Sequence, residues 1–98
     1  MKVNINSVHF KTDKKLDLFI TDKLNKLATV HTDLIGGDVM LKLANTDNPD
    51  NKIIEIRLLI KGNDLFAKKQ SKSFEEATDN AIDALKKQLN KYKEKLKN

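Results

Sequence analysis

Several residue types are absent from this chain of 98 residues or scarce in it, and each absence excludes a kind of protein. The chain has no cysteine, so disulfide bonds and thiolate chemistry are excluded. No stretch approaches the roughly 18 apolar residues of a membrane span, and residues 1–15 lack the apolar run of a signal peptide. We therefore expect a cytoplasmic protein that does not bind a membrane.

Aromatic residues are also few, with four Phe, one Tyr and no Trp. Proteins that read single-stranded RNA base by base commonly stack the bases on aromatic side chains. Tyr92 is a candidate for such stacking, but it falls on an apolar helical stripe, where a packed ring with its hydroxyl at the edge is the more common arrangement. Recognition of shape and charge is the better prediction for an RNA partner.

Residues for catalysis or metal binding do not form a recognisable pattern. His9 and His31 have no companion His or Cys at ligand spacing. The polar turn at residues 45–51 contains a proline and lacks the glycine of an EF-hand loop. Gly36-Gly37 precedes a strand rather than a helix, so it cannot arrange backbone amides around a phosphate. We predict a protein that is not an enzyme and takes no cofactor, no metal and no small-molecule substrate.

Charge, by contrast, is abundant and unevenly distributed. Nineteen Lys and Arg against fourteen Asp and Glu give a net charge of +5, which favours nucleic acid or another anionic surface as a partner. Residues 73–85 contain four acids and no base, whereas residues 86–98 contain six lysines and one glutamate. Acids at the start of a helix and lysines at its end complement the macrodipole. Six lysines exceed that need and point to a polyanionic partner.

Hydrophobic periodicity predicts a strand, a helix and a second strand in the first half of the chain. Apolar residues alternate from Val3 to about Val8 and then recur at helical spacing over residues 13–30, with Thr12 as the expected N-cap. Gly36-Gly37 breaks the pattern, and a second strand is expected at residues 39–44.

The second half of the chain predicts a β-hairpin followed by a long helix. Residues 53–61 alternate most clearly, and Gly62-Asn63 is expected to form a type II′ turn into a strand at about residues 64–70. A capping box that begins at Ser73 starts an amphipathic helix over residues 74–96.

The element order β-α-β-β-β-α predicts an α+β fold in a single domain spanning residues 1–98. The helical crossover makes the first two strands parallel, and the short later connections make the other pairs antiparallel. The result is a four-stranded mixed sheet with both helices packed on one face. The open face is expected to carry the polar residues Asn4, Asn6, Lys42, Glu55, Arg57, Lys61 and Lys68.

The six lysines of the last helix fall on two flanks of its apolar stripe when they are placed on a helical wheel. Lysines spaced at i, i+4 and i+8 form a ladder about 12 Å long, comparable in scale to successive phosphates of a nucleic acid. If the helices pack side by side, Lys23 and Lys26 add to this surface. The alternative is that the lysines only keep an exposed helix soluble. One flank carries Lys87, Lys91 and Lys95, and the other carries Lys86, Lys93 and Lys97.

The chain resembles the ribosome hibernation-promoting factor family, which includes the ribosome-associated inhibitor A proteins. The resemblance covers essentially the whole sequence. The chain is expected to be the short form of the family, since it ends right after the basic helix. It is carried by Val3-Asn4-Ile5, Phe10-Lys11-Thr12, residues 22–27 (DKLNKL) and above all residues 74–95 (FEEATDNAIDALKKQLNKYKEK).

This resemblance implies a factor that binds the small ribosomal subunit in the channel used by mRNA and tRNA, and that inhibits translation in resting or starved cells. Its partners would be the small subunit and its rRNA, and the protein would be a monomer off the ribosome. Ala84 stands where many relatives are expected to have a base. By position, the predicted RNA-binding residues are Lys23, Lys26, Lys87 and Lys91, together with Lys86, Lys93 and Lys95.

Two other functions stay open from the sequence. The predicted meander with packed helices is topologically close to double-stranded RNA-binding domains, which recognise a free duplex of about 16 base pairs. A protein-protein adaptor would instead use the open sheet face and would keep its partner when the helix lysines are neutralised.

Overall fold

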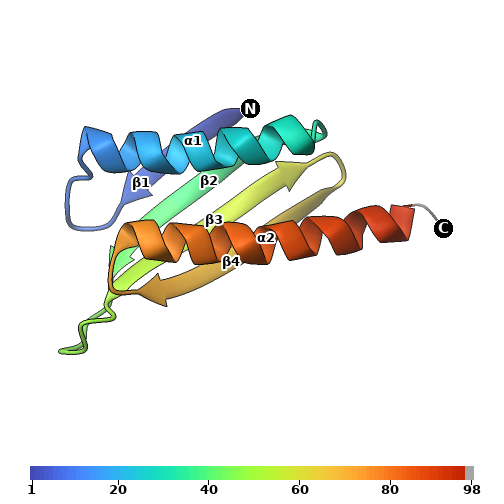
Figure 1. The fold of residues 1–98 in the computed structure, drawn as a ribbon. Helices are drawn as coiled ribbons and strands as arrows, with labels where there is room; N and C mark the ends of the chain where they lie inside the picture. Colours follow the sequence, from blue (N-terminus) through green and yellow to red (C-terminus); the bar gives the residue numbers. More distant parts are fainter. Residues whose placement is uncertain (97–98) are drawn as a thin grey trace.

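A computed structural model, which describes residues 1–96, contains six elements in the predicted order (Figure 1). The strands form one sheet in the order β1-β2-β3-β4, and both helices lie on the same face of it (Figure 1). β1 and β2 are parallel, whereas the other two pairs are antiparallel. The predicted α+β fold is therefore confirmed. The elements are β1 (Lys2–Ser7), α1 (Lys14–Val30), β2 (Leu34–Leu43), β3 (Lys52–Ile60), β4 (Asn63–Ser71) and α2 (Phe74–Leu96).

The core lies between the sheet and the two helices. Ile54, Ile56 and Leu58 alternate along β3, and all three are fully buried. Leu85 and Leu89 of α2 are fully buried against them. Full burial of such a side chain stabilises the fold by roughly 1.5–3 kcal/mol, so the alternation in β3 and the helical stripe of α2 fix which faces meet.

The start of α1 differs from the prediction. Asp13, not Thr12, is the N-cap, because its side chain accepts a hydrogen bond of 2.7 Å from the backbone N–H of Leu16. Aspartate is the better capping residue of the two, and its negative charge is stabilised by the positive end of the helix dipole. The helix consequently begins at Lys14.

β2 begins earlier than the sequence predicts, at Leu34, and includes both glycines that were expected to precede it. A Cβ at Gly36 would lie 3.0 Å from the backbone oxygen of Lys2 in the neighbouring strand β1. Glycine is therefore the residue that allows the two backbones to approach here. The pairing of β2 with β3 is irregular between Leu34 and Gly36.

The turn between β3 and β4 is shifted by one residue from the prediction. Ile60 pairs with Asn63, so the two turn residues are Lys61 and Gly62. Of these two turn residues, only Gly62 has a positive φ, of 83°. The expected type II′ turn is therefore wrong, because that turn needs a positive φ at its first central residue, whereas a type II turn needs it at the second.

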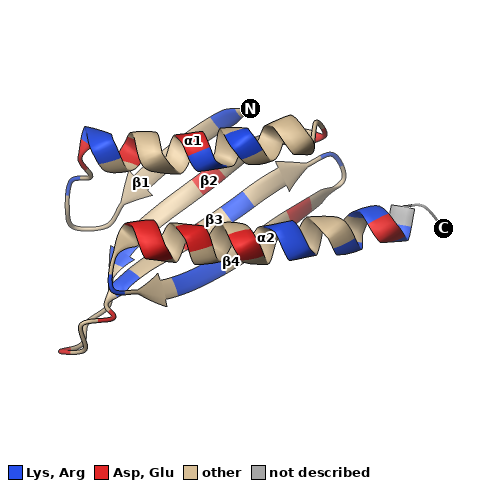
Figure 2. Cartoon of the chain, in the orientation of Figure 1, with Lys and Arg blue, Asp and Glu red and all other residues tan. Residues whose placement is uncertain are grey.

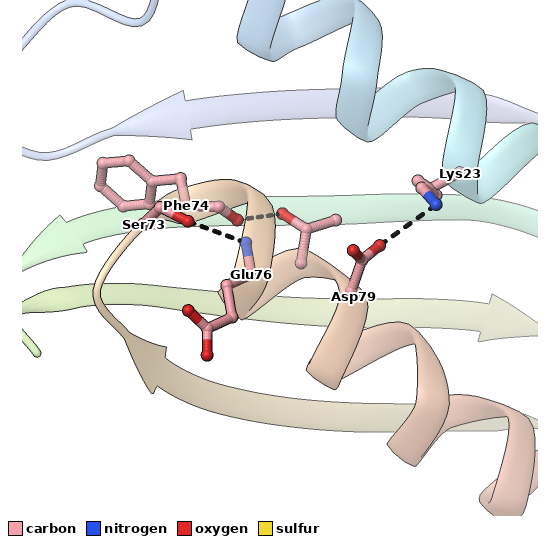
Figure 3. A network of polar contacts seen from close by, with 6 residues as sticks. Lys23, Ser73, Phe74, Glu76 and Asp79 are labelled. Atoms are coloured by element: carbon pink, nitrogen blue, oxygen red, sulfur yellow. Dashed lines mark hydrogen bonds and ion pairs between the residues drawn. The ribbon is translucent and has the colours of Figure 1, made fainter.

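The predicted capping box at the start of α2 forms one of its two hydrogen bonds, since within residues 1–96 the Glu76 carboxylate accepts none from the backbone N–H of Ser73 (Figure 3). The hydroxyl of Ser73 accepts a 3.1 Å hydrogen bond from the backbone N–H of Glu76. The buried Thr78 donates its hydroxyl hydrogen to the backbone oxygen of Phe74 at 2.6 Å. Both contacts fix the first turns of the helix that carries the predicted lysines.

Replacing the cap is expected to destabilise the whole domain. Ser73→Ala removes the hydroxyl that accepts a hydrogen bond from the Glu76 N–H and leaves that N–H without a protein partner. The substitution should lower the free energy of unfolding by about 1 kcal/mol. Guanidinium denaturation followed by circular dichroism measures this effect. Ser73→Asp is the matched control, since it keeps an acceptor at the same place. A Ser73→Ala midpoint equal to that of the unchanged chain would contradict the role of the cap.

Candidate nucleic-acid interface

The two helices lie side by side on the sheet, and an ion pair joins them (Figure 3). The Lys23 Nζ of α1 lies 3.2 Å from the Asp79 Oδ1 of α2. The same ammonium lies 5.3 Å from the centre of the Phe19 ring. Both partners of the pair are partly exposed, so its contribution to stability is about 0–1 kcal/mol. Its main effect is to hold Lys23 at the boundary between the helices.

A groove of about 710 Å³ runs between α1 and α2. Three of the seven predicted RNA-binding lysines line it, although they come from different helices. Apolar and acidic residues, which were not among the predicted site residues, also line the groove. Its lining includes Lys23, Lys26, Lys86, Asp79, Asp83, Leu27, Val30 and Ile82.

Three other predicted lysines, Lys87, Lys91 and Lys95, are exposed and do not line the groove. Between these lysines and the sheet edge, the Gln88 side chain donates a 2.7 Å hydrogen bond to the backbone oxygen of Phe66 in β4. The basic half of α2 thus presents its lysines on two flanks, as the helical wheel predicts. Lys97, which the helical wheel places on the flank of Lys86 and Lys93, lies outside the described residues.

Lys93 is half-buried, as is Lys23, whereas the other five predicted lysines are exposed. Lys93 lies close enough to His31, at the end of α1, for its charge to act on the imidazole. Burial, and secondly the positive charge of Lys93, lower the pKa of His31, while Asp33 opposes this effect. His31 is therefore neutral near pH 7 and lines the same groove. His31 has no companion His or Cys at ligand spacing in the sequence, and only the packing of α1 against α2 relates it to the lysines.

The acidic half of α2 limits where a polyanion can bind (Figure 2). Four exposed carboxylates occupy the first turns, and the lysines follow them along the same helix. A phosphate chain is repelled by the first half and attracted by the second. The acidic residues are Glu75, Glu76, Asp79 and Asp83.

The open face of the sheet has a different character. Two ion pairs across neighbouring strands neutralise part of its charge, whereas Lys61 and Lys68 form none among residues 1–96. Phe66 is 45% exposed there, beside the guanidinium of Arg57 at 5.7 Å. The cross-strand contacts are Asn4 to Asp38 at 3.1 Å, Lys42 to Glu55 at 2.7 Å and Arg57 to Asp64 at 3.7 Å.

Residues 1–96 show neither a metal-binding cluster nor a membrane-spanning helix. No group of three His, Asp or Glu side chains there is arranged to hold a metal ion. No helix in this part of the chain is both long enough and apolar enough to cross a membrane.

The structure defines a class of α+β domain with a four-stranded mixed sheet, two helices on one face and a lysine-rich second half of α2, and comparison with known proteins assigns the family. Residues 3–97 match the family described as sigma 54 modulation protein / S30EA ribosomal protein. The chain belongs to this family, which confirms the resemblance found in the sequence. Among curated proteins, no significant relative was found.

Two solved structures share the fold. A ribosomal subunit interface protein from Coxiella burnetii superposes with a TM-score of 0.83 at 18% identity, covering 95% of this chain and 98% of that chain. The N-terminal domain of Protein Y from Thermus thermophilus superposes with a TM-score of 0.80 at 18% identity, covering 94% of this chain and 99% of that chain. At this level of identity, the similarity shows a common architecture.

Proposed function

We propose that the protein is a non-enzymatic inhibitor of translation that binds the small ribosomal subunit in resting cells. As a single cytoplasmic domain of residues 1–98 and a monomer off the ribosome, it would occupy the decoding channel and exclude mRNA and tRNA. Family membership and the fold shared with a ribosomal subunit interface protein of Coxiella burnetii support a ribosomal partner.

The observation that carries the proposal is the exposed lysine row on a firmly anchored helix. Lys87 projects from the part of α2 that Leu85 and Leu89 fix to the sheet, and Lys91 and Lys95 project from the following turns, which contain the half-buried Tyr92. A lysine ammonium is a mobile point charge that follows a phosphate backbone without reading bases. The remaining proposed contacts, on the groove side, are Lys23, Lys26, Lys86 and Lys93.

The direct test is cosedimentation of the protein with purified small ribosomal subunits at low salt. We expect the protein to migrate with the subunit, and its absence from that fraction would contradict the proposal. A free RNA duplex of about 16 base pairs is the comparison ligand, because a double-stranded RNA-binding module would bind it without a ribosome. An adaptor that works through the sheet face would bind neither the small subunit nor the duplex, since that face carries charges of both signs that pair with each other.

Charge reversal on the exposed row should remove most of the affinity. The double variant Lys87→Glu/Lys91→Glu deletes two of about six phosphate contacts, which corresponds to a loss on the order of 10²-fold near 0.1 M salt. Both side chains are exposed, so the circular dichroism spectrum should not change.

The matched control for this variant is Lys14→Glu/Lys15→Glu at the start of α1, which changes the net charge equally with two other exposed lysines. Equal losses for the two variants would mean that only net charge matters. An unfolded Lys87→Glu/Lys91→Glu variant would mean that these lysines are structural.

A further inference from the structure

We propose that the groove between α1 and α2 receives one unstacked nucleotide of the bound RNA, with the base on its apolar floor and the phosphate on the lysines at its rim. This inference rests on the proposed function and adds the chemical unit that the helix pair would hold. The groove combines apolar lining residues with lysines on both helices, which suits an RNA nucleotide better than an acidic peptide.

The size and floor of the groove suit a planar base. Its volume of about 710 Å³ falls in the range of about 300–1,000 Å³ typical of small-molecule sites. Leu27 and Ile82 line it as nearly buried core residues, 3% and 5% exposed. Val30 lines it from the end of α1 and is 71% exposed, so its side chain is free to contact a ligand. An apolar ring placed here would cover Val30.

The rim of the groove has a net positive charge. Asp79 is already neutralised by Lys23. Among the residues that the structure describes, neither Lys26 nor Lys86 forms an ion pair. The remaining carboxylate, that of Asp83, therefore shares the groove with two lysines, Lys26 of α1 and Lys86 of α2. Free ammonium groups on both walls suit the phosphates on either side of one nucleotide.

Polar groups beside the apolar floor distinguish a nucleotide from an acidic peptide. Asn90 supplies an amide that both donates and accepts hydrogen bonds. The Asp83 carboxylate accepts hydrogen bonds from base amino groups or a ribose hydroxyl, donors that the carboxylate side chains of an acidic peptide lack. His31 is 6% exposed, and its Nδ1 has no hydrogen-bond partner within residues 1–96. A buried ring nitrogen without a partner is a group that a ligand can satisfy.

The test is a titration of the full ¹⁵N-labelled chain with adenosine 5′-monophosphate, followed by backbone amide chemical shifts. We expect saturable shifts at Val30, His31 and Asn90, and clearly smaller ones with ribose 5-phosphate, which lacks the base. Equal shifts with inorganic phosphate alone, or none with the nucleotide, would overturn the inference. Shifts at these amides with hexaglutamate instead of the nucleotide would overturn it in favour of a protein partner.

A pair of variants separates the groove from the rest of the surface. Val30→Glu puts a carboxylate at the groove on an exposed position and should weaken both nucleotide and small-subunit binding on the order of tenfold. Leu18→Glu is the control, since Leu18 is 53% exposed on the same helix and does not line the groove.

The two proposals fail in different ways. If the unchanged chain binds the small subunit and Val30→Glu binds both ligands equally well, the groove inference alone is wrong. If the unchanged chain shows nucleotide-dependent shifts but does not sediment with the small subunit, the proposed function is wrong.

Discussion

Raising the salt concentration from 50 to 200 mM is expected to weaken binding of the protein to the small ribosomal subunit by about 10³-fold. Each lysine that neutralises a phosphate releases condensed counterions, so the affinity falls with a power of the salt concentration that grows with the number of contacts. About six contacts, nearly all of the seven proposed lysines, give a slope close to −5 in a plot of log affinity against log salt. Sedimentation of the complex across a salt series measures this slope.

The Lys87→Glu/Lys91→Glu variant makes the salt experiment quantitative. Loss of two contacts should flatten the slope by about 1.8, whereas Lys14→Glu/Lys15→Glu should leave it close to that of the unchanged chain. An affinity that stays constant across the series would contradict phosphate recognition. An equally steep slope with a free 16-base-pair duplex at equal affinity would favour a double-stranded RNA-binding module over a ribosome-specific factor.

The fold could be predicted from the sequence because its hydrophobic pattern changes period clearly between elements. The buried residues Ile54, Ile56 and Leu58 alternate along β3, and the buried residues of α2 recur at helical spacing. The wheel separated Lys86 from Lys87, and the structure places Lys86 in the groove and Lys87 outside it. Placement of a residue on one regular helix needs no tertiary information.

Local details of the turns and caps could not be predicted in the same way. Thr12 and Asp13 are both acceptable capping residues, and the choice between them depends on where α1 enters the fold. Gly36 suggested a break in the pattern, but its actual role depends on the backbone of β1, which is distant in sequence. Gly62 was placed correctly in a turn but at the wrong position of it.

The groove was not predictable from local sequence because its two walls meet only through tertiary packing. Lys23 belongs to α1 and Asp79 to α2, and no periodicity within either helix relates them. The one sequence signal was the spacing of Asp79 and Asp83, four residues apart and therefore on one side of α2. The spacing indicates a site only because this side of α2 packs toward α1.

Leu89→Ala is expected to be the most damaging single substitution tested on the basic half of α2. The side chain is fully buried, and its truncation should lower the free energy of unfolding by about 2–5 kcal/mol through lost burial and a cavity. That is a large part of the roughly 5–15 kcal/mol that stabilises a typical domain. Guanidinium denaturation measures the loss, and Leu18→Ala, on the exposed side of α1, should stay within about 0.5 kcal/mol of the unchanged chain.

The same substitution links stability to binding. Beyond Leu89, α2 is held by the half-buried Tyr92, whose hydroxyl lies 3.5 Å from the backbone oxygen of Lys61. We therefore expect Leu89→Ala to speed hydrogen exchange of the amides at residues 90–95 more than at residues 77–82, and to weaken small-subunit binding although no lysine has changed. Binding that survives with its full salt slope in a variant whose basic half exchanges freely would mean that flexible lysines suffice, and that the rigid helix is not what positions them.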